Sequence, residues 1–467
     1  MTAPVTIREV MTDKQLFGDQ FGGDSFAAWR ALLAAFYGLE LTDDERRILE
    51  AITGRAGPFL GAFSELWMAI GRRGGKSQIA ALVAVFEAAF KDHRDKLAPG
   101  EWATVMLLAA DRQQARTLLR YTRGLFQNPM LAPLVTRETE SSIELGGTRT
   151  IIEIATASHR ATRGYTVSAC VADEIAFWFH DGASPDRAII QAIRPALATL
   201  GGPLLALSSP YARRGILWDT YKAHYAGDSD RILVAQAPSL TMNPTLPESV
   251  VAEAMRDDPA SALAEYGAQF RTDIASFIDP VLVEDATRRK PLILPPREGI
   301  TYRAFCDPSG GGADGFSLAV AHTEAGRIII DLVTERHGSP AKITGEYASI
   351  LRQYRITEVT GDRYSGAWVR DEFSKHGIRY HTAPTDRSGL YLEFLAKLNS
   401  GSVILPPDPK LQRQLIALER RTSRGGRDTI DHPPNAHDDL ANSIAGAVAI
   451  SRQRQAETIT RRIAGLL

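Results

Sequence analysis

Short apolar segments alternate with longer amphipathic segments along the first half of the chain. The apolar segments are ELWMAI (65–70), ATVMLLAA (103–110), TIIEIATA (150–157), SACVADE (168–174) and PLLALSS (203–209), with helical patterns at 75–91, 111–126 and 186–199. Buried strands that alternate with helices pair in parallel, so this order predicts a mostly parallel α/β sheet. Ahead of the sheet, residues 1–50 have the apolar spacing of amphipathic helices, one of which has a capped start at Thr42.

The second half of the chain has a different order of elements. The strand patterns YRAFCD (302–307), FSLAVAHT (316–323) and RIIIDLVTE (327–335) follow one another directly, and a helix (340–354), the strand EVTGD (358–362) and further helices come after them. Three strands in a meander followed by helix, strand and helix is the order of an RNase H-like fold. Between 240 and 295 the pattern is weaker, with one helix predicted at 247–268 and a linker that ends near Pro295 and Pro296. The expected division is a helical segment (1–50), a parallel-sheet domain (51–240), a linker or helical subdomain (241–296) and an RNase H-like domain (297–467).

A glycine-rich turn joins the first strand to the first helix of the parallel sheet. It reads IGRRGGKS (70–77) and departs from the phosphate-binding spacing G-x-x-x-x-G-K-[ST], because position 70 is Ile and the glycine stands at 71. The glycines still let the backbone approach phosphates, the lysine can reach the β- and γ-phosphates of a nucleotide, and the serine can bind Mg²⁺. The alternative is an Arg/Gly turn on the surface. The predicted nucleotide-binding residues are Gly71, Arg72, Arg73, Gly74, Gly75, Lys76, Ser77 and Asp173.

Two polar pairs end later strands of the same sheet. Asp173 and Glu174 follow a buried strand, where an aspartate can hold Mg²⁺ through water and a glutamate can orient or deprotonate an attacking water. Ser208 and Ser209 stand where a sensor of the γ-phosphate would lie, although Ser-Ser-Pro is also an ordinary exit from a strand. Charge that develops on the phosphoryl group requires a cation, and the candidates are Arg72, Arg73 and Arg163. These motifs predict a P-loop NTPase with an ASCE-type parallel sheet.

Separated aspartates define a second candidate centre, in the RNase H-like domain. Asp307 and Asp362 end two strands, and Asp438 and Asp439 open the last helix, so these carboxylates can converge on one edge of the sheet. Carboxylates gathered in this way repel one another unless cations lie between them, and oxygen ligands suit Mg²⁺ or Mn²⁺. Two such ions can activate water for the cleavage of a phosphodiester. Each aspartate by itself could instead be a turn or cap residue.

Composition narrows the class of protein further. The chain has 54 basic and 55 acidic residues and a net charge of −1, so a nucleic-acid partner would depend on local clusters of basic residues. One cluster flanks a Gly-Gly turn and could follow a phosphate backbone, or it could be a solvated hairpin; its members are Arg420, Arg421, Arg424 and Arg427. Two cysteines far apart exclude a disulfide framework and fit a reducing cytoplasm. No apolar run is long enough to span a bilayer, so no membrane partner is expected.

Taken together, GRRGGKS, ATRGYTVSACVADE, LLALSSP, FCDPSGG, TGDRYSG and NAHDDLAN resemble the motifs of the large subunit of tailed-bacteriophage terminases, over residues 40–450. Members of this family are DNA-packaging motors with an N-terminal ATPase and a C-terminal RNase H-like nuclease. The resemblance implies ATP and Mg²⁺ as cofactors, with Mn²⁺ as a further ion for the nuclease. It also implies ATP-driven translocation of double-stranded DNA into a procapsid and metal-dependent cutting of concatemeric DNA.

The resemblance also implies roles for single residues. Lys76 and Ser77 would contact phosphate and Mg²⁺, Asp173 would bind the metal, and Glu174 would be catalytic. Coupling of hydrolysis to movement would fall to Ser208 and Ser209, and the arginine finger would be Arg163, acting across subunits, or Arg72. The nuclease metals would be held by Asp307, Asp362 and one of Asp438 and Asp439.

The partners that the family implies are double-stranded DNA, a portal protein, a small terminase subunit and further copies of the chain in a ring, commonly pentameric, on the capsid. The place of action would be the host cytoplasm. The nearest alternative is a helicase or translocase with a nuclease, of the DNA-repair or mobile-element type, but the stretch between 210 and 300 contains no further DNA-contacting motif. A nucleotide-gated assembly protein with decayed catalysis is disfavoured because Glu174 and the aspartates are intact.

Overall fold

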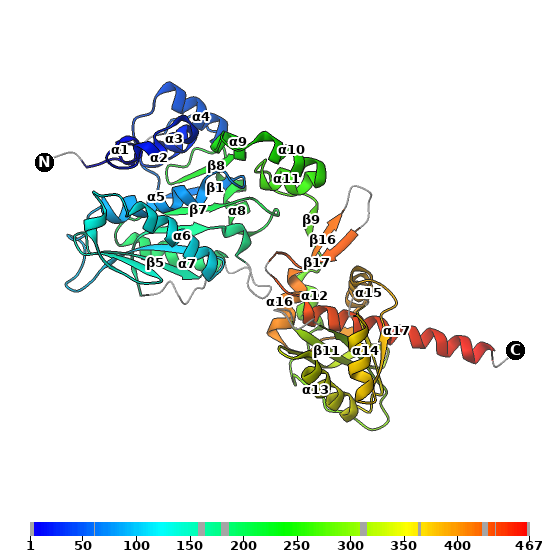
Figure 1. Cartoon of the computed structure of the whole chain (residues 1–467). Helices are drawn as coiled ribbons and strands as arrows, with labels where there is room; N and C mark the ends of the chain where they lie inside the picture. Colours follow the sequence, from blue (N-terminus) through cyan, green and yellow to red (C-terminus); the bar gives the residue numbers. More distant parts are fainter. Residues whose placement is uncertain are drawn as a thin grey trace. The chain divides into compact units, whose positions relative to one another are not determined.

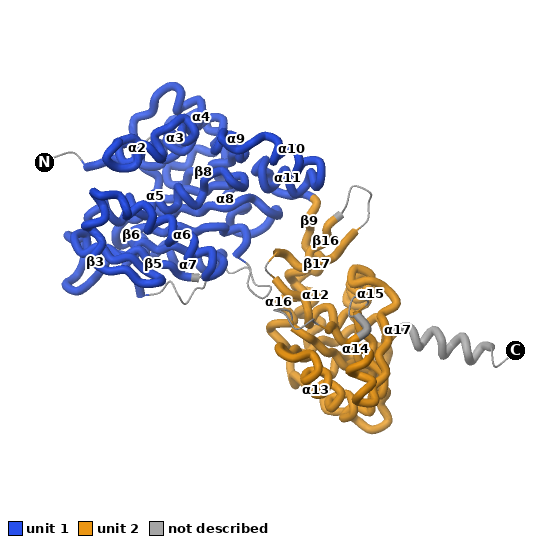
Figure 2. Tube along the Cα trace, viewed as in Figure 1, with its two compact units in different colours: residues 1–179, 184–272 blue, residues 180–183, 273–467 orange. Residues whose placement is uncertain are grey.

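The computed structural model describes residues 4–59, 61–156, 164–178, 186–308, 315–362, 366–422, 428–434 and 436–464 (Figure 1). The chain forms two compact units, which are coloured separately in Figure 2. Unit 1 consists of Met1–Phe179 and Ser184–Thr272, and unit 2 consists of His180–Ala183 and Asp273–Leu467.

Unit 1 is built on an eight-stranded sheet with the order β3-β4-β5-β2-β6-β7-β1-β8. The six strands from β5 to β8 in this order run parallel, and β3 and β4 add an antiparallel hairpin at one edge. The central strands are buried along their whole length, as expected for a sheet that helices cover on both faces. The strands are β1 (Glu65–Ile70), β2 (Ala103–Ala109), β3 (Val135–Glu138), β4 (Ser142–Leu145), β5 (Thr150–Thr156), β6 (Thr166–Asp173), β7 (Leu204–Ser208) and β8 (Ile232–Ala237).

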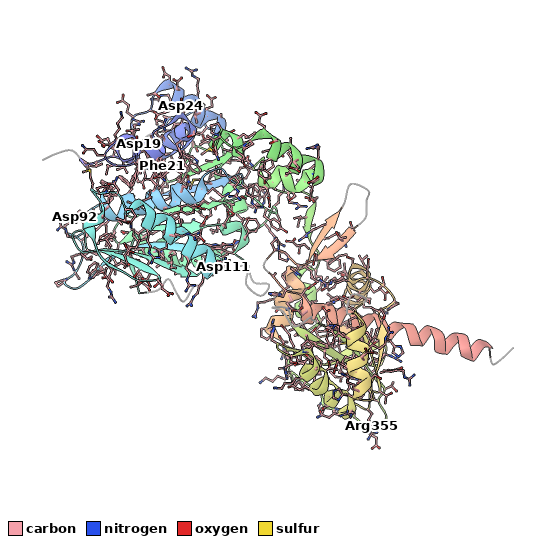
Figure 3. All side chains as sticks on the ribbon, viewed as in Figure 1. Asp19, Phe21, Asp24, Asp92, Asp111 and Arg355 are labelled. Carbon is pink, nitrogen blue, oxygen red and sulfur yellow. The ribbon has the colours of Figure 1, made fainter. Side chains whose placement is uncertain are left out.

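Helices pack on both faces of this sheet. One face is covered by the N-terminal helices α1–α4 with α5 and α6, and the other by α7 and α8. Local signals fix several helix starts: a capping box at Thr42 begins α4, and the carboxylate of Asp111 (Figure 3) accepts the N–H groups of Gln113 and Gln114 at the start of α6. The helices are α1 (Ile7–Thr12), α2 (Gly18–Phe21), α3 (Ala27–Phe36), α4 (Asp43–Thr53), α5 (Lys76–Ala89), α6 (Arg112–Leu125), α7 (Asp186–Ala198), α8 (Gly215–His224), α9 (Ser239–Met242), α10 (Glu248–Asp257) and α11 (Pro259–Glu265).

The single helix predicted at 247–268 is wrong, because the structure has two helices there, α10 and α11. Asp258 lies between them in an extended conformation and caps α11 by accepting the N–H of Ser261. Pro259 occupies the first position of α11, where its missing N–H costs nothing. The Asp-Pro pair therefore ends one helix and begins the next.

A buried carboxyl group connects α5 with the N-terminal helices. Glu87 of α5 is 3% exposed and accepts a 2.7 Å hydrogen bond from the hydroxyl of Tyr37. Burial raises the pKa of Glu87 from 4.5 to about 7, although the Tyr37 hydroxyl and the Lys91 ammonium group act in the opposite direction. The folded protein therefore keeps this proton at pH values where the unfolded chain has already released it, and this group favours unfolding as the pH rises from 4.5 to about 7.

Replacing Glu87 with Gln should make the protein more stable at pH 8, by up to about 3 kcal/mol, and change its stability little at pH 5. Glutamine can still accept the Tyr37 hydrogen bond and cannot ionise. Urea denaturation of both proteins at the two pH values measures the difference, and Glu50→Gln, at an exposed position of α4, is the control. An equal stability difference at pH 5 and pH 8 would contradict the prediction.

Unit 2 is built on a six-stranded sheet with the order β14-β13-β10-β11-β12-β15. Its strand β11 runs antiparallel to β10 and β12, while β13 and β14 run parallel to β10. A small antiparallel sheet contains the hairpin β16–β17 and the strand β9. The strands are β9 (Ile274–Ser276), β10 (Tyr302–Asp307), β11 (Phe316–Glu324), β12 (Arg327–Arg336), β13 (Glu358–Gly361), β14 (Arg379–Thr382), β15 (Val403–Ile404), β16 (Glu419–Thr422) and β17 (Asp428–Asp431).

Two apolar cores lie on the two faces of this sheet. One contains α13 and α14, and the other contains α15, α16 and the long helix α17, which packs directly on β10 and β11. Gly446 permits this close approach, because a Cβ there would lie 2.3 Å from the ring of Phe305. The helices are α12 (Pro280–Ala286), α13 (Pro340–Gln353), α14 (Gly366–Lys375), α15 (Arg387–Asn399), α16 (Pro409–Ala417) and α17 (Asp439–Ala464).

The predicted fold class is confirmed. In unit 1 one strand, β7, separates the strand that leads into the glycine-rich turn from the strand that ends with Asp173, which is the ASCE arrangement. In unit 2 the order β12-β11-β10-β13-β14, with β11 antiparallel to the rest, is that of an RNase H-like fold. Among the described residues, none of the helices has the length and apolar character needed to cross a membrane.

Candidate functional site

The first candidate site lies where β1 passes into α5 in unit 1. Lys76 is the first residue of α5 and is 7% exposed. Its ammonium group donates to the carbonyl of Ile70 at 3.0 Å and to the hydroxyl of Ser209 at 2.8 Å. Because β1 and β7 are parallel neighbours, the end of β7 brings Ser209 next to the loop that begins after β1. The structure thus places Lys76 beside a predicted coupling residue.

The first glycine of this loop stands at position 71 rather than 70 for a steric reason. A Cβ at Gly71 would lie 2.4 Å from the hydroxyl oxygen of Ser239 and 2.7 Å from the carbonyl of Tyr266. Position 70, where the usual spacing requires glycine, is instead the last buried residue of β1. Glycine is therefore needed at 71, where the loop touches α9, and an apolar residue is needed at 70.

The acidic pair after β6 joins the same site. Glu174 has a left-handed backbone conformation (φ 51°), and this turns its carboxylate toward the end of β7. One of its oxygens accepts hydrogen bonds from the hydroxyl of Ser208 at 2.9 Å and from the N–H of Ser209 at 3.2 Å, and the other lies 3.8 Å from the Lys76 ammonium group. The ends of β1, β6 and β7 thus bring a lysine, a glutamate and two serines into one connected network.

Asp173 is the most deeply buried acid of this site, with 6% of its surface exposed. Burial, and then the charge of Glu174, raise the pKa of its carboxyl group well above the ordinary value, although Lys76 opposes them. Among the described residues, its Oδ1 atom has no hydrogen-bond partner. A buried carboxylate oxygen without a partner suits a cation, so Asp173 fits the predicted Mg²⁺ site, together with the hydroxyl of Ser77 on the first turn of α5.

The three candidate arginines differ in their surroundings. Arg72 is exposed and forms a 2.8 Å ion pair with Glu265 of α11, which raises the pKa of its guanidinium group. Arg73 has a left-handed conformation (φ 64°), and its carbonyl accepts a hydrogen bond from Asn243. Arg163 lies outside the described residues. Arg72 is thus part of the loop, but its guanidinium group is paired with α11 rather than with the network of Lys76 and Glu174.

The second candidate site lies at the carboxyl ends of β10 and β13 in unit 2. These strands are parallel neighbours, so Asp307 at the end of β10 and Asp362 just after β13 lie side by side. The amide of Asn442 donates to Oδ2 of Asp307 at 2.8 Å and to Oδ2 of Asp362 at 3.4 Å. Burial raises the pKa of Asp307 to about 7, with smaller contributions in the same direction from Asp362 and Asp438. The buried Asp362 and the half-buried Asp307 share one neutral donor, and two neighbouring carboxylates of this kind fit a cation between them.

Asp438 and Asp439 have other contacts. Asp438 is buried, and it accepts hydrogen bonds from the hydroxyl of Tyr391 at 2.7 Å and from the guanidinium group of Arg387 at 3.4 Å. Asp439 lies 3.4 Å from the N–H of Gly315, and burial, with the charges of Glu335 and Asp438, raises its pKa to about 6. Among the described residues, no three acidic, histidine or cysteine side chains lie close enough together to hold a metal ion. Asp307 and Asp362 are brought together, whereas the third predicted ligand is not placed with them.

The predicted DNA-binding arginines lie in and beside the hairpin β16–β17. Arg421 donates to Glu419 at 3.2 Å and to the carbonyl of His432 at 3.0 Å. Arg420 lies 3.6 Å from Asp428, and its guanidinium group is 5.5 Å from the centre of the Phe277 ring. Both therefore contribute to the packing of the hairpin. Arg424 and Arg427 lie outside the described residues.

Several residues of these sites were not predicted from the sequence. In unit 2 these are Arg387 and Tyr391 of α15 and Asn442 of α17. Asn442 had a signal, because it follows Asp438 by four residues and therefore lies on the same side of the helix start. Arg387 and Tyr391 had no such signal in the sequence, since only the folded structure brings α15 next to α17. In unit 1 the missed residues are Trp29, Ser239 and Asn243, which bind the glycine-rich loop.

No family model and no curated protein matches this chain. Several solved structures are similar to it, and structures of two different proteins span nearly the whole chain. The large terminase of bacteriophage HK97 shares 16% identity over 90% of this chain and 99% of that one, with a TM-score of 0.38. The large terminase of a second, thermophilic bacteriophage shares 11% identity over 91% of this chain and 98% of that one, with a TM-score of 0.41.

The chain resembles bacteriophage large terminases. The nuclease of the large terminase from another thermophilic phage, G20c, matches 36% of this chain and 95% of its own, with 18% identity and a TM-score of 0.32. The second full-length terminase is also known in complex with ADP and with ATP-γ-S, and the G20c nuclease with bound magnesium and with bound cobalt. Since the identities and the TM-scores are low, the assignment of a function to this chain depends on the residues of its two sites.

Proposed function

We propose that this chain is the motor subunit of a bacteriophage DNA-packaging machine, in which unit 1 hydrolyses ATP and unit 2 cuts DNA with divalent metal ions. The network that joins Lys76, Glu174 and Ser209 at the ends of three strands is the observation that carries this proposal. This network supplies an ammonium group that can bind phosphate, a carboxylate that can orient water, and a serine that connects the two by hydrogen bonds. The pair of Asp307 and Asp362 supports the second activity.

In unit 1 the N–H groups of residues 73 and 75–77 and the Lys76 ammonium group would bind the β- and γ-phosphates of ATP, since the N–H groups of residues 71, 72 and 74 donate to carbonyl groups of the protein. Asp173 and Ser77 would hold Mg²⁺, which when bound neutralises charge on the phosphates. Glu174 would accept a proton from the attacking water, since its carboxylate is already oriented by Ser208 and by the N–H of Ser209. Arg163, from a neighbouring subunit, or Arg72 would stabilise the charge of the transition state.

The coupling of ATP hydrolysis to movement of the DNA would begin at the end of β7. Ser209 contacts Lys76 through its hydroxyl and Glu174 through its N–H, and Ser208 contacts Glu174 as well. Arrival of a γ-phosphate would draw Lys76 away from Ser209, because the ammonium group has only three donors. The state of the nucleotide would in this way change the contacts of β7.

In unit 2 Asp307 and Asp362 would hold divalent ions, Mg²⁺ or Mn²⁺, with Asp438 or Asp439 as the third carboxylate. Such ions, when bound, activate water and stabilise the leaving oxygen in phosphodiester cleavage. The substrate would be concatemeric double-stranded DNA, which Arg420, Arg421, Arg424 and Arg427 would help to bind. The chain would act in the host cytoplasm as a homo-oligomeric ring, together with a portal protein and a small terminase subunit.

Replacing Lys76 with Met tests the nucleotide site. Methionine keeps the apolar stem of this buried side chain and removes the charge, so the affinity for a fluorescent ATP analogue with Mg²⁺ should fall by about tenfold or more. Lys14→Ala, at an exposed position, is the control and should bind like the wild type. If Lys76→Met bound the analogue with unchanged affinity, the nucleotide would have to lie elsewhere.

A further inference from the structure

Three consecutive carbonyl groups of the glycine-rich loop are each bound by a side chain from a distant part of unit 1. The hydroxyl of Ser239 donates to the carbonyl of Arg72 at 2.6 Å, and the amide of Asn243 donates to the carbonyl of Arg73 at 2.9 Å. The indole N–H of Trp29 donates to the carbonyl of Gly74 at 2.9 Å. The first two donors come from α9 and the residue after it, and the third comes from α3.

These bonds determine which way the peptide groups of the loop face. In a trans peptide the C=O of one residue and the N–H of the next point in opposite directions. A carbonyl held toward α3 or α9 therefore turns the following N–H, that of Arg73, Gly74 or Gly75, away from these helices. The N–H of Gly74 closes a turn on the carbonyl of Gly71 at 3.2 Å. The N–H groups of Arg73 and Gly75 are left on the side away from the helices, where N–H groups presented in this way form a concave anion-binding backbone.

The donors lie tightly against the loop. Trp29 is 1% exposed, and a Cβ at Gly75 would lie 3.2 Å from its indole nitrogen. Ser239 is fully buried and would lie 2.4 Å from a Cβ at Gly71. The glycines at both ends of the loop thus permit contact with the donors, in addition to any contact with phosphate. A loop that is held from both sides loses little freedom when a ligand binds.

We propose that Trp29, Ser239 and Asn243 are positioning residues, here called the carbonyl clamp, which hold the loop in the conformation that binds the β- and γ-phosphates. The clamp rests on the proposed nucleotide site and acts through the loop, without touching the nucleotide. It also connects that site to the N-terminal helices and to α9.

Replacing Trp29 with Phe removes the indole donor and keeps most of the aromatic packing. Trp67→Phe is a matched control, because Trp67 is buried in β1 of the same unit and donates its indole N–H to Glu65 at 2.9 Å, away from the loop. The dissociation constant of fluorescent mant-ADP with Mg²⁺ and the melting temperature are measured for both. Loss of one hydrogen bond, about 1 kcal/mol, predicts a roughly fivefold weaker affinity in Trp29→Phe and wild-type affinity in Trp67→Phe, at similar melting temperatures.

Steady-state kinetics separates positioning from catalysis. Trp29→Phe should raise KM for ATP and leave kcat within about twofold of the wild type, because Glu174 and Ser208 keep their contacts. Asn243→Ala and Ser239→Ala should weaken mant-ADP binding in the same way. Equal mant-ADP affinities for Trp29→Phe and Trp67→Phe would overturn the clamp. If the wild type bound no mant-ADP, or Lys76→Met bound it as tightly as the wild type, the nucleotide site itself would fail instead.

Discussion

Replacing Glu174 with Gln is expected to reduce ATP turnover by at least about a hundredfold while ATP still binds, because a general base typically contributes that much or more. Glutamine can still accept the hydrogen bonds from Ser208 and Ser209, which hold Glu174 in the structure. It cannot take a proton from water, so binding and hydrolysis should separate. Phosphate release at saturating ATP measures turnover, and a fluorescent analogue measures binding.

Glu140→Gln is a suitable control, because Glu140 is an exposed acid of unit 1 whose side chain is 88% accessible. It should hydrolyse ATP at the wild-type rate. If Glu174→Gln kept its turnover, Glu174 would have no part in the reaction, and Asp173 would be the remaining acid of this site that could act as the base.

The second large effect is expected in unit 2. Replacing Asp362 with Asn should reduce Mn²⁺- or Mg²⁺-dependent nicking of plasmid DNA by at least about a hundredfold, because one of the two carboxylates that would hold the proposed cation is lost. ATP turnover should stay at the wild-type rate, since the network of Lys76 and Glu174 lies in the other unit. Agarose-gel analysis of supercoiled plasmid and a phosphate-release assay, on the same preparation, measure the two activities.

Asp371→Asn, at an exposed position of α14, is the matched control for charge removal and should nick DNA like the wild type. Loss of both activities in Asp362→Asn, at an unchanged melting temperature, would contradict two chemically separate sites. Full nicking activity in this variant would remove Asp362 from the metal centre.

The main elements of both sheets could be predicted from the sequence because their signals are local. Fully apolar segments such as 65–70 and 103–110 are recognisable as buried strands without knowledge of their partners. The meander at 302–335 is recognisable from three successive strand patterns. In these two sheets β3, β4, β8, β14 and β15 escaped prediction. All of them except β4 are edge strands, and all except β8 have four residues or fewer, so their patterns are weak.

The candidate sites were predictable only in part, for a similar reason. Lys76, Glu174 and Ser209 each follow a strand of one parallel sheet, and the carboxyl ends of such strands meet at one edge. Trp29 gave no such signal, because its spacing marks it as a core residue and its hydrogen bond to the loop spans 45 positions of the sequence. For Asp438 the sequence signal pointed to a metal ligand at a helix start. In the structure its carboxylate instead accepts hydrogen bonds from Arg387 and Tyr391.

The most direct test of the central claim is ATP-dependent protection of DNA from DNase in the presence of purified procapsids that carry their portal. With linear DNA that needs no cutting, the wild type and Asp362→Asn should both protect full-length DNA when ATP is present. Glu174→Gln should protect none. Protection by Glu174→Gln equal to that by the wild type, or none by the wild type although it hydrolyses ATP, would contradict a motor driven by the site at Lys76 and Glu174.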